Sequence, residues 1–274
     1  MPGAGRPANP TPGAERPHSP TIAQLREVTQ PPSVRTRAGA EHWVANAYLR
    51  DISPYLTRVL LRAGFSANGV TWLMIACAAL AAVATGWPSI AGAILAVLLV
   101  QLQMLVDCCD GEVARWRETS SPRGVYLDRV GHYVAECGIA VALGVRASGG
   151  PQVAGVWISA GLLLGLLVAL NKVENDLVHV SRHYAGLTQM RDADEVRVPS
   201  GGVLRSARRI ARYIPFHRVF LSVELTLLIL VAAVVDLFVG DLLATKVLLA
   251  ALLVSAVVTV IGHLAAVLAS SRLR

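Results

Sequence analysis

Six apolar runs, each long enough or nearly long enough to cross a bilayer, constrain the fold of this chain more than any other feature. They lie at about Val70–Gly86, Ile90–Val106, Leu127–Val145, Val153–Leu170, Val219–Val239 and Leu242–Ala269. A helix needs ~20 apolar residues to span the ~30 Å hydrocarbon layer. Only 16% of the residues are charged, whereas ~25% is usual for a soluble domain. The sequence therefore predicts an all-α integral membrane protein whose residues 67–274 form a six-transmembrane-helix bundle.

The third run differs from the others because Arg129, His132 and Glu136 interrupt its first half. Charged groups within membrane helices usually face a protein interior or a water-filled cavity, and they are often functional. We therefore expect these three side chains to face a cavity between helices.

The distribution of arginines predicts the orientation. Nearly all of them lie in the N-terminal region, the 107–128 and 173–218 connections and the C-terminus. By the positive-inside rule, both termini and the 107–128 segment are cytoplasmic, and we expect the protein in the bacterial inner (plasma) membrane. The net charge of +7 then indicates attraction to anionic phospholipids rather than nucleic-acid binding.

Two segments precede the bundle. Residues 1–40 contain eight of the fourteen prolines, a composition that predicts a disordered cytoplasmic leader. Residues 41–66 alternate apolar and charged positions at helical spacing, which predicts an interfacial amphipathic helix. The pair Ser53-Pro54 resembles a helix start, so this element is expected to be two short helices.

The 173–218 connection contains a second basic pattern. Spacings of three and four place four arginines on one helical face: Arg205, Arg208, Arg209 and Arg212. Two interpretations are open, namely contact with phospholipid headgroups and binding of a phosphate-bearing substrate.

Acidic residues gather where the second run ends and the third begins. Asp107 and Asp110, at i and i+3, share one helical face, and Asp128, His132 and Glu136, at i, i+4 and i+8, share another. The polar connection around Pro122 lets the two helices turn back on each other. We expect the two faces to meet in one oxygen-rich cluster.

Three converging carboxylates repel one another unless a cation neutralises them. Mg²⁺ and Mn²⁺ prefer oxygen ligands and bridge them to phosphates. Gly111 and Gly124 leave room for a bulky group, and Arg115 offers a fork to a phosphate. The pattern therefore predicts metal-assisted chemistry on a diphosphate. The alternative is a set of structural ion pairs between the two helices, with Asp110 paired to Arg129 and Asp128 to Arg115.

The same residues resemble the signature of the CDP-alcohol phosphotransferase (CDP-alcohol phosphatidyltransferase) family, Asp-x₂-Asp-Gly-x₂-Ala-Arg-x₈-Gly-x₃-Asp-x₃-Asp. The matching positions are Asp107, Asp110, Gly111, Ala114, Arg115, Gly124 and Asp128, and His132 replaces the fourth aspartate. The segment Ala67-Asn68-Gly69-Val70-Thr71 is similar to the family's Pro-Asn-x-Val-Thr element, with alanine in place of proline. This resemblance is specific over roughly residues 50–147.

The resemblance implies transfer of a phospho-alcohol group from a CDP-alcohol to an acceptor hydroxyl, with release of CMP. We expect CDP-diacylglycerol as the donor, a role in phospholipid biosynthesis, and one or two Mg²⁺ or Mn²⁺ ions. The implied metal ligands are Asp107, Asp110 and Asp128, and the implied nucleotide-binding residues are Asn68, Thr71, Gly111, Ala114, Arg115 and Gly124. A homodimer is a further expectation from the family.

His132 is the one departure from the signature. In the family, the fourth aspartate is assigned to deprotonating the acceptor and, in some members, to ligating metal. Histidine has a pKa of ~6.5 in model peptides and accepts a proton near neutral pH. Three interpretations are open: catalytic base, metal ligand, or an altered site that no longer catalyses. Glu136, one turn deeper, either orients the imidazole, acts as the base, or makes a packing hydrogen bond.

Other functional classes fit the sequence less well. A prenyltransferase would carry a second Asp-rich motif, and a transporter is expected to show internal repeats. A binding or scaffold protein derived from the enzyme stays open because of His132. The acidic residues Glu174, Asp176, Glu224 and Asp236 either line an acceptor pocket with Asn171 and Asn175 or pair with arginines.

Overall fold

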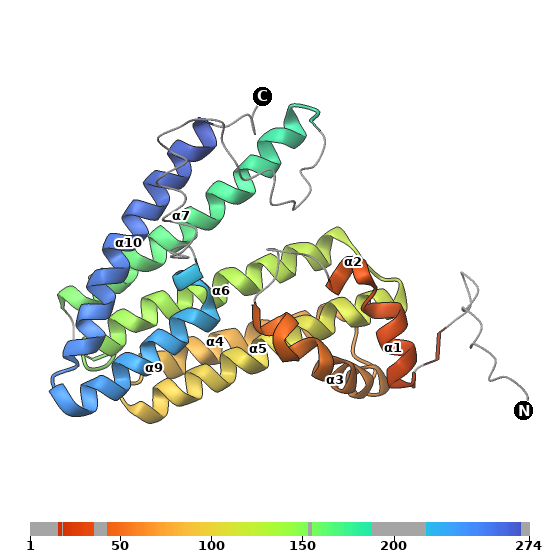
Figure 1. The fold of residues 1–274 in the computed structure, drawn as a ribbon, viewed down its shortest axis with the longest axis horizontal. Helices are drawn as coiled ribbons and strands as arrows, with labels where there is room; N and C mark the ends of the chain where they lie inside the picture. The colour runs from red at the N-terminus through yellow and green to blue at the C-terminus, as the bar shows by residue number, and fades with distance from the viewer. Residues whose placement is uncertain (1–15, 18, 36–42, 153–154, 188–217, 270–274) are drawn as a thin grey trace, which may run out of the picture.

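The computed structural model describes residues 16–17, 19–35, 43–152, 155–187 and 218–269, and every regular element in these ranges is a helix (Figure 1). The basic face at Arg205–Arg212 lies outside the described residues, as do residues 1–15, 18 and 36–40 of the proline-rich leader. The predictions made for those segments therefore stay predictions.

Five helices are long and apolar enough to cross a membrane, which confirms an all-α integral membrane protein. They are α4 (Ala67–Gly86), α5 (Ile90–Arg117), α7 (Val156–Tyr184), α9 (Ser222–Val239) and α10 (Leu243–Leu268). Their starts lie within three residues of the predicted ones, because each apolar run begins at a turn or capping residue. α5 and α7 continue well beyond their apolar parts into polar sequence that carries the candidate site.

α6 (Pro122–Ala147) contains the predicted third span but is not among these five helices. Its polar residues lower its hydropathy, as the sequence indicated. It is nonetheless central to the bundle, because it packs against both α4 and α7. The count of six spans stays a prediction.

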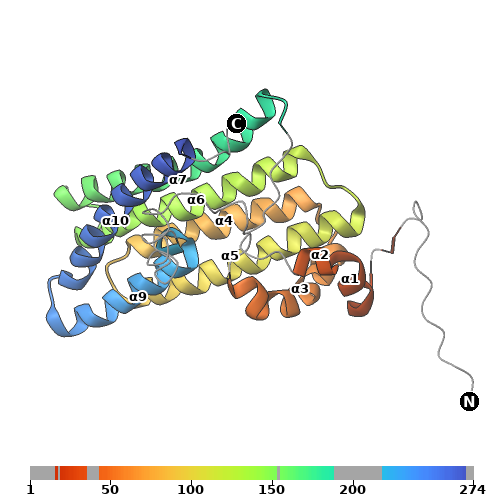
Figure 2. The same cartoon turned by 45° about the horizontal axis from the view of Figure 1, so that its top comes forward.

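α4 packs along both α5 and α6, and both views place it between them (Figures 1 and 2). α7 packs on the other side of α6, α10 packs on α7, and α9 packs on α5. The main apolar core is formed where these helices meet, for example at Val100, Ile139 and Leu164, which are fully buried. This arrangement fixes α5 and α6 relative to each other through α4.

Serine caps set the starts of α4, α5 and α6. The Oγ atoms of Ser66, Ser89 and Ser121 accept hydrogen bonds from the backbone N–H three residues later, at 3.1–3.2 Å. α6 also has Pro122 at its first position, where the missing N–H is not needed. Because α5 ends at Arg117, only four residues connect it to α6, and the two chemistry-bearing helix ends are held close together.

Glycines allow α6 and α7 to approach closely. A Cβ placed on Gly161 would lie 2.6 Å from the Cα of Gly144, and one placed on Gly144 would lie 2.6 Å from the carbonyl oxygen of Trp157. A real Cβ does not fit at such distances, so this crossing requires glycine at both positions.

The prediction that residues 1–40 are disordered throughout is wrong for the part that the structure describes. Residues Ile22–Thr29 form α1, which begins with a capping box between Thr21 and Gln24, and Pro32–Arg35 form α2. Leu25 is fully buried in a second apolar cluster, together with Val106, Cys109 and Val113 of α5. Proline content alone misled the prediction, because buried Leu25 and the contacts of Thr29 and Gln30 with α5 dock this segment.

The prediction of two short helices separated at Ser53-Pro54 is also wrong. A π-helical turn, η1 (Ala45–Leu49), runs directly into α3 (Arg50–Arg62), and α3 continues through Pro54. Ser53 is buried rather than serving as a cap. Ile52, Tyr55 and Val59 of α3 are exposed, which fits the expected interfacial helix, but its location at the membrane surface stays a prediction.

Candidate metal and phosphate site

The two acidic helix faces meet as the spacing predicted. One ligand atom each from Asp107 on α5 and from Asp128 and His132 on α6 lie within 4.8 Å of one another. His132 Nε2 is 3.3 Å from Oδ1 of Asp107 and 3.5 Å from Oδ1 of Asp128. All three side chains are partly exposed. A divalent cation fits this donor set, because two carboxylate oxygens and an imidazole nitrogen from two rigid helices point at one volume.

Asp110 is held from the side by α4. The hydroxyl of Thr71 donates to Oδ2 of Asp110 at 2.8 Å. The i+3 spacing predicted that Asp110 shares a face with Asp107, and both line one cleft. Thr71, which the sequence linked to the nucleotide site through a separate motif, therefore belongs to the same cluster.

This cleft, which we call the acidic cleft, has a volume of about 230 Å³. It lies between α3, α5 and α6, and it contains both acidic and basic side chains. The lining residues are Ala45, Arg50, Met104, Asp107, Cys108, Asp110, Gly111, Arg115, Asp128 and His132. The cleft thus contains the two kinds of group that a metal-bound phosphate needs: carboxylates to bind the metal and guanidiniums to bind the phosphate.

Gly111 provides the space that Arg115 occupies. A Cβ placed on Gly111 would lie 3.0 Å from Nη1 and 3.3 Å from Nη2 of Arg115. The guanidinium therefore folds back along α5 over the glycine backbone, and its Nε donates to the carbonyl oxygen of Thr29 at 2.6 Å. The sequence predicted room for a ligand at Gly111, whereas the structure places the Arg115 side chain there.

The starts of α4 and α6 meet beside the cleft. A Cβ placed on Gly124 would lie 3.4 Å from Oδ1 of Asn68, so these two residues of separate motifs are neighbours. Ala114, one turn beyond Asp110 on α5, is half-buried. Their assignment to a nucleotide pocket stays a prediction.

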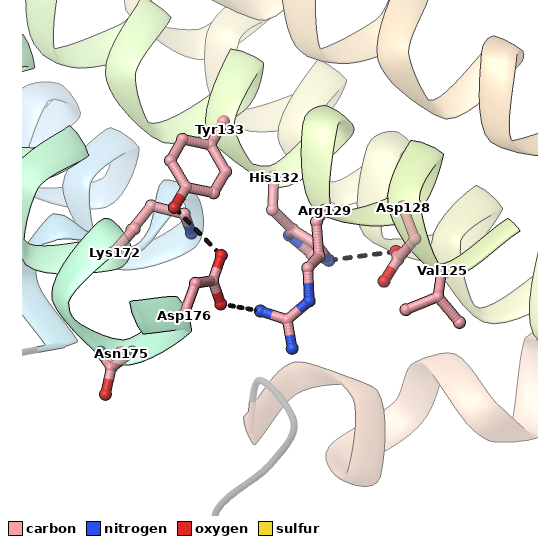
Figure 3. A pocket seen from close by; sticks show the side chains of 8 residues that line it. All are labelled: Val125, Asp128, Arg129, His132, Tyr133, Lys172, Asn175 and Asp176. Carbon is pink, nitrogen blue, oxygen red and sulfur yellow. Dashed lines mark hydrogen bonds and ion pairs between the residues drawn. The ribbon is translucent and has the colours of Figure 1, made fainter. Parts of the chain in front are cut away.

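A second pocket of about 360 Å³ opens between α6 and α7 and shares Asp128 and His132 with the acidic cleft (Figure 3). Asp176 of α7 forms an ion pair with Arg129 and accepts a hydrogen bond from the hydroxyl of Tyr133. Asn175 and Lys172 also line this pocket. The alternative pairing of Arg129 with Asp110 is not what the structure shows, since the partner of Arg129 is on α7.

Glu136 lies deeper and is almost completely buried. Its Oε2 is 2.9 Å from Nζ of Lys172 on α7, and that ammonium also lies 5.3 Å from the ring centre of Tyr133. Burial of a carboxylate requires such a partner. Of the roles considered for Glu136, the geometry gives direct support to packing between α6 and α7.

Asp236, expected in an acceptor pocket or an arginine pair, caps α10. Its carboxylate accepts from the backbone N–H of Ala244 at 2.7 Å and from the hydroxyl of Thr245 at 2.5 Å. Glu174 and Asn171 of α7 both contact Nδ1 of His263 on α10, at 3.3 and 3.1 Å. These polar residues thus connect the helices of the bundle to one another.

Arg50 is the cleft residue that the sequence did not indicate. It belongs to α3, and its side chain is only 7% exposed although it lines the acidic cleft. No spacing links it to Asp107, because its position depends on how α3 docks on α5. The amphipathic pattern of residues 41–63 places it simply on a polar face.

The sequence of the chain is similar to those of known proteins. A sequence model of the CDP-alcohol phosphatidyltransferase family matches residues 65–261. The chain is 37% identical over 156 residues to the "Bifunctional IPC transferase and DIPP synthase" of Rubrobacter xylanophilus. That alignment covers 53% of this chain and 33% of the relative, so the two proteins correspond over only about a third of the relative.

Proposed function

The chain belongs to the CDP-alcohol phosphatidyltransferase family, and from this premise we propose that it transfers a phosphatidyl-type group from CDP-diacylglycerol to an acceptor hydroxyl. The reaction releases CMP and serves phospholipid biosynthesis. The observation that carries the proposal is the convergence of Asp107, Asp128 and His132 at one volume beside an arginine-lined cleft. We further propose that the site opens on the cytoplasmic leaflet of the bacterial inner membrane, where arginines flank α5 and α6.

The bonds change as follows in the proposed reaction. The acceptor oxygen forms a bond to the β-phosphorus of the CDP-alcohol, and the bond from that phosphorus to the bridging oxygen breaks. The bridging oxygen leaves with the electron pair as part of CMP. The acceptor hydroxyl loses its proton to a base, so a phosphodiester and CMP are formed without any other reactant.

Asp107, Asp110 and Asp128 would hold the Mg²⁺ or Mn²⁺, with His132 as a further potential ligand. A bound divalent cation supplies stabilisation of the negative charge that develops on the leaving group. Thr71 fixes one oxygen of Asp110 through its hydroxyl, which leaves the other oxygen as the ligand atom. The residues present therefore fit the cation that the family requires.

We assign the base to His132. Its Nε2 lies at the junction of the acidic cleft and the α6–α7 pocket, where an acceptor entering from the pocket meets a donor in the cleft. Neutral imidazole accepts a proton near neutral pH. We assign Glu136 a positioning role, because its carboxylate holds Lys172 and so fixes α6 against α7.

For the nucleotide we propose a pocket around Asn68, Gly111, Ala114 and Gly124, with Arg115 on the phosphates. The contact between Asn68 and Gly124 supports this assignment, since it joins the motif before α4 to the start of α6. The acceptor enters through the α6–α7 pocket, which is lined by charged side chains of both signs, among them Arg129, Lys172 and Asp176. The name of the Rubrobacter relative includes a synthase activity as well as a transferase activity, and we therefore test donors beyond CDP-diacylglycerol.

The experiment is a CMP-release assay on purified protein, with a panel of CDP-alcohols and hydroxyl acceptors in Mg²⁺ or Mn²⁺. We expect at least one pair to yield CMP and a phosphodiester, and Asp107→Asn to release none. Asp241→Asn is the matched control, because it makes the same change in the connection between α9 and α10. If no pair yields CMP above the Asp107→Asn background, the enzyme proposal fails, and a binding role derived from the family fold takes its place.

A further inference from the structure

Arg50 brings a second guanidinium into the acidic cleft from outside the signature motif. It is the first residue of α3, and it lines the cleft together with Asp107, Asp110 and Arg115. Two guanidiniums and at least two carboxylates around one cleft form a site for an anionic group that also carries a cation.

The main chain of Arg50 is held by Gln30 because of a proline. Pro54 lacks the N–H that would normally donate to the carbonyl oxygen of Arg50 four residues earlier. Gln30 supplies the missing donor, with its Nε2 at 2.6 Å from that oxygen. The same Nε2 lies 2.7 Å from Oε1 of Glu112. The side-chain amide of Gln30 therefore connects the start of α3 to Glu112 of α5, the residue that follows Gly111.

Glu112 makes this junction specific. It is fully buried, and it also accepts hydrogen bonds from the hydroxyls of Ser53 and Thr57 on α3. Removing one of the three donors would leave a buried carboxylate oxygen without its partner, which is strongly unfavourable, so α3 has one favoured register on α5. That register determines where Arg50 enters the cleft.

Thr29, the residue before Gln30, fixes the position of the second arginine, Arg115. Thr29 ends α1, and its carbonyl oxygen, which has no intrahelical donor at this position, accepts from Nε of Arg115 at 2.6 Å. The consecutive residues Thr29 and Gln30 thus fix the position of Arg115 and Arg50, respectively. Arg16 and Pro17 extend the contact along α5, because Arg16 donates to the carbonyl oxygen of Trp116 at 2.9 Å and Trp116 donates to that of Pro17 at 3.2 Å.

We propose that Arg50 and Arg115 form a clamp for the diphosphate of the donor, and that residues 19–30 position this clamp through Thr29 and Gln30. The proposal rests on the proposed function and adds to it a diphosphate-contacting residue and a positioning segment. Guanidinium groups suit the task because they donate paired hydrogen bonds to phosphate oxygens and remain charged.

The test compares the binding of CDP and CMP to the whole purified protein in Mg²⁺, by calorimetry. The ratio of the two dissociation constants isolates the contribution of the β-phosphate and requires no turnover. We expect Arg50→Met to lower the preference for CDP by about tenfold or more, the magnitude of a lost charge-assisted hydrogen bond, while CMP affinity changes little. Arg50→Lys retains a positive charge but not the forked guanidinium. Its preference for CDP is expected to lie between those of the wild type and Arg50→Met.

Gln30→Ala tests the positioning role. It leaves both guanidiniums in place, and we expect it to lower the CDP preference in the same direction while CMP affinity is retained. The matched control is Arg58→Met, since Arg58 also belongs to α3 but lines neither the acidic cleft nor the α6–α7 pocket, and its ratio should equal that of the wild type.

The outcomes separate the two proposals. A wild-type preference for CDP that survives in Arg50→Met overturns the clamp, and one that survives in Gln30→Ala overturns the positioning role of the N-terminal segment. If the wild-type protein binds neither nucleotide in Mg²⁺, the proposed function itself fails. If Arg50→Met weakens CMP and CDP equally, Arg50 supports the fold rather than the diphosphate, and the clamp is again overturned.

Discussion

At the scale of single residues, the proposed mechanism depends on His132. It occupies the position of the signature's fourth aspartate, and its Nε2 lies within 3.5 Å of carboxylate oxygens on both helices. Replacing aspartate by histidine removes one negative charge from the cluster and places an imidazole there. We propose that it accepts a proton at the boundary between the acidic cleft and the α6–α7 pocket, both of which it lines.

We predict that His132→Ala lowers turnover by roughly 10²–10⁴-fold, the usual contribution of a general base, while nucleotide binding is largely retained. His132→Asp restores the family residue and should keep most of the activity. Turnover is measured as CMP release, and binding by calorimetry. Near-normal turnover in His132→Ala would contradict the assignment and move the base to Glu136 or to water.

The spacing of residues predicted part of this site. Helical periodicity was enough to predict that Asp107, Asp128 and His132 lie together. Asp128 and His132 share one face of α6, Asp107 lies on the acidic face of α5, and the connection between the two helices is short. It did not indicate that Arg129 pairs with Asp176 or that Glu136 pairs with Lys172. Those partners lie on α7, and no local pattern gives the rotation of one helix against another.

At the scale of elements, the sequence predicted those helices well whose position depends on the length of an apolar run. The predicted and observed starts of α5 coincide at Ile90, because Pro88-Ser89 precedes the apolar run. α3 and α1 were predicted poorly. Pro54 does not end α3, since Gln30 satisfies the carbonyl that the proline leaves without a donor, and such compensation depends on a distant residue.

The crossing of α6 and α7 gives a prediction about stability. Gly161→Ala places a methyl group 2.6 Å from the Cα of Gly144, so the helices must separate, at a cost of about 1–3 kcal/mol. We expect a lower midpoint of thermal unfolding, followed with a thiol-reactive dye, because three of the four free cysteines are buried.

Gly262→Ala is the control for this variant. Gly262 belongs to α10, and a Cβ there meets no atom within 4 Å among the described residues. Alanine has the higher helix propensity, so this variant should unfold at the wild-type temperature or slightly above it. An equal effect of the two substitutions would show that the α6–α7 crossing does not depend on close backbone approach.

At the scale of the whole molecule, the bundle and the N-terminal helices have separate tasks. α4 holds α5 and α6 in place, so that their acidic faces meet, and α1 and α3 cover the end of α5 and bring Arg50 into the cleft (Figure 2). Composition predicted the membrane bundle because burial of apolar length dominates its energetics. It could not predict the docking of residues 19–35, which depends on a few buried polar contacts such as that of Gln30 with Glu112.

The central claim is that side chains of α5 and α6 together hold a divalent cation. The most direct test is a Mn²⁺ titration of the purified protein, in which electron paramagnetic resonance measures the free ion. We predict saturable binding to the wild type and to Asp241→Asn, and a loss of that binding in Asp128→Asn, which removes one of the three converging ligands. Equal Mn²⁺ binding by Asp128→Asn and the wild type would contradict the claim.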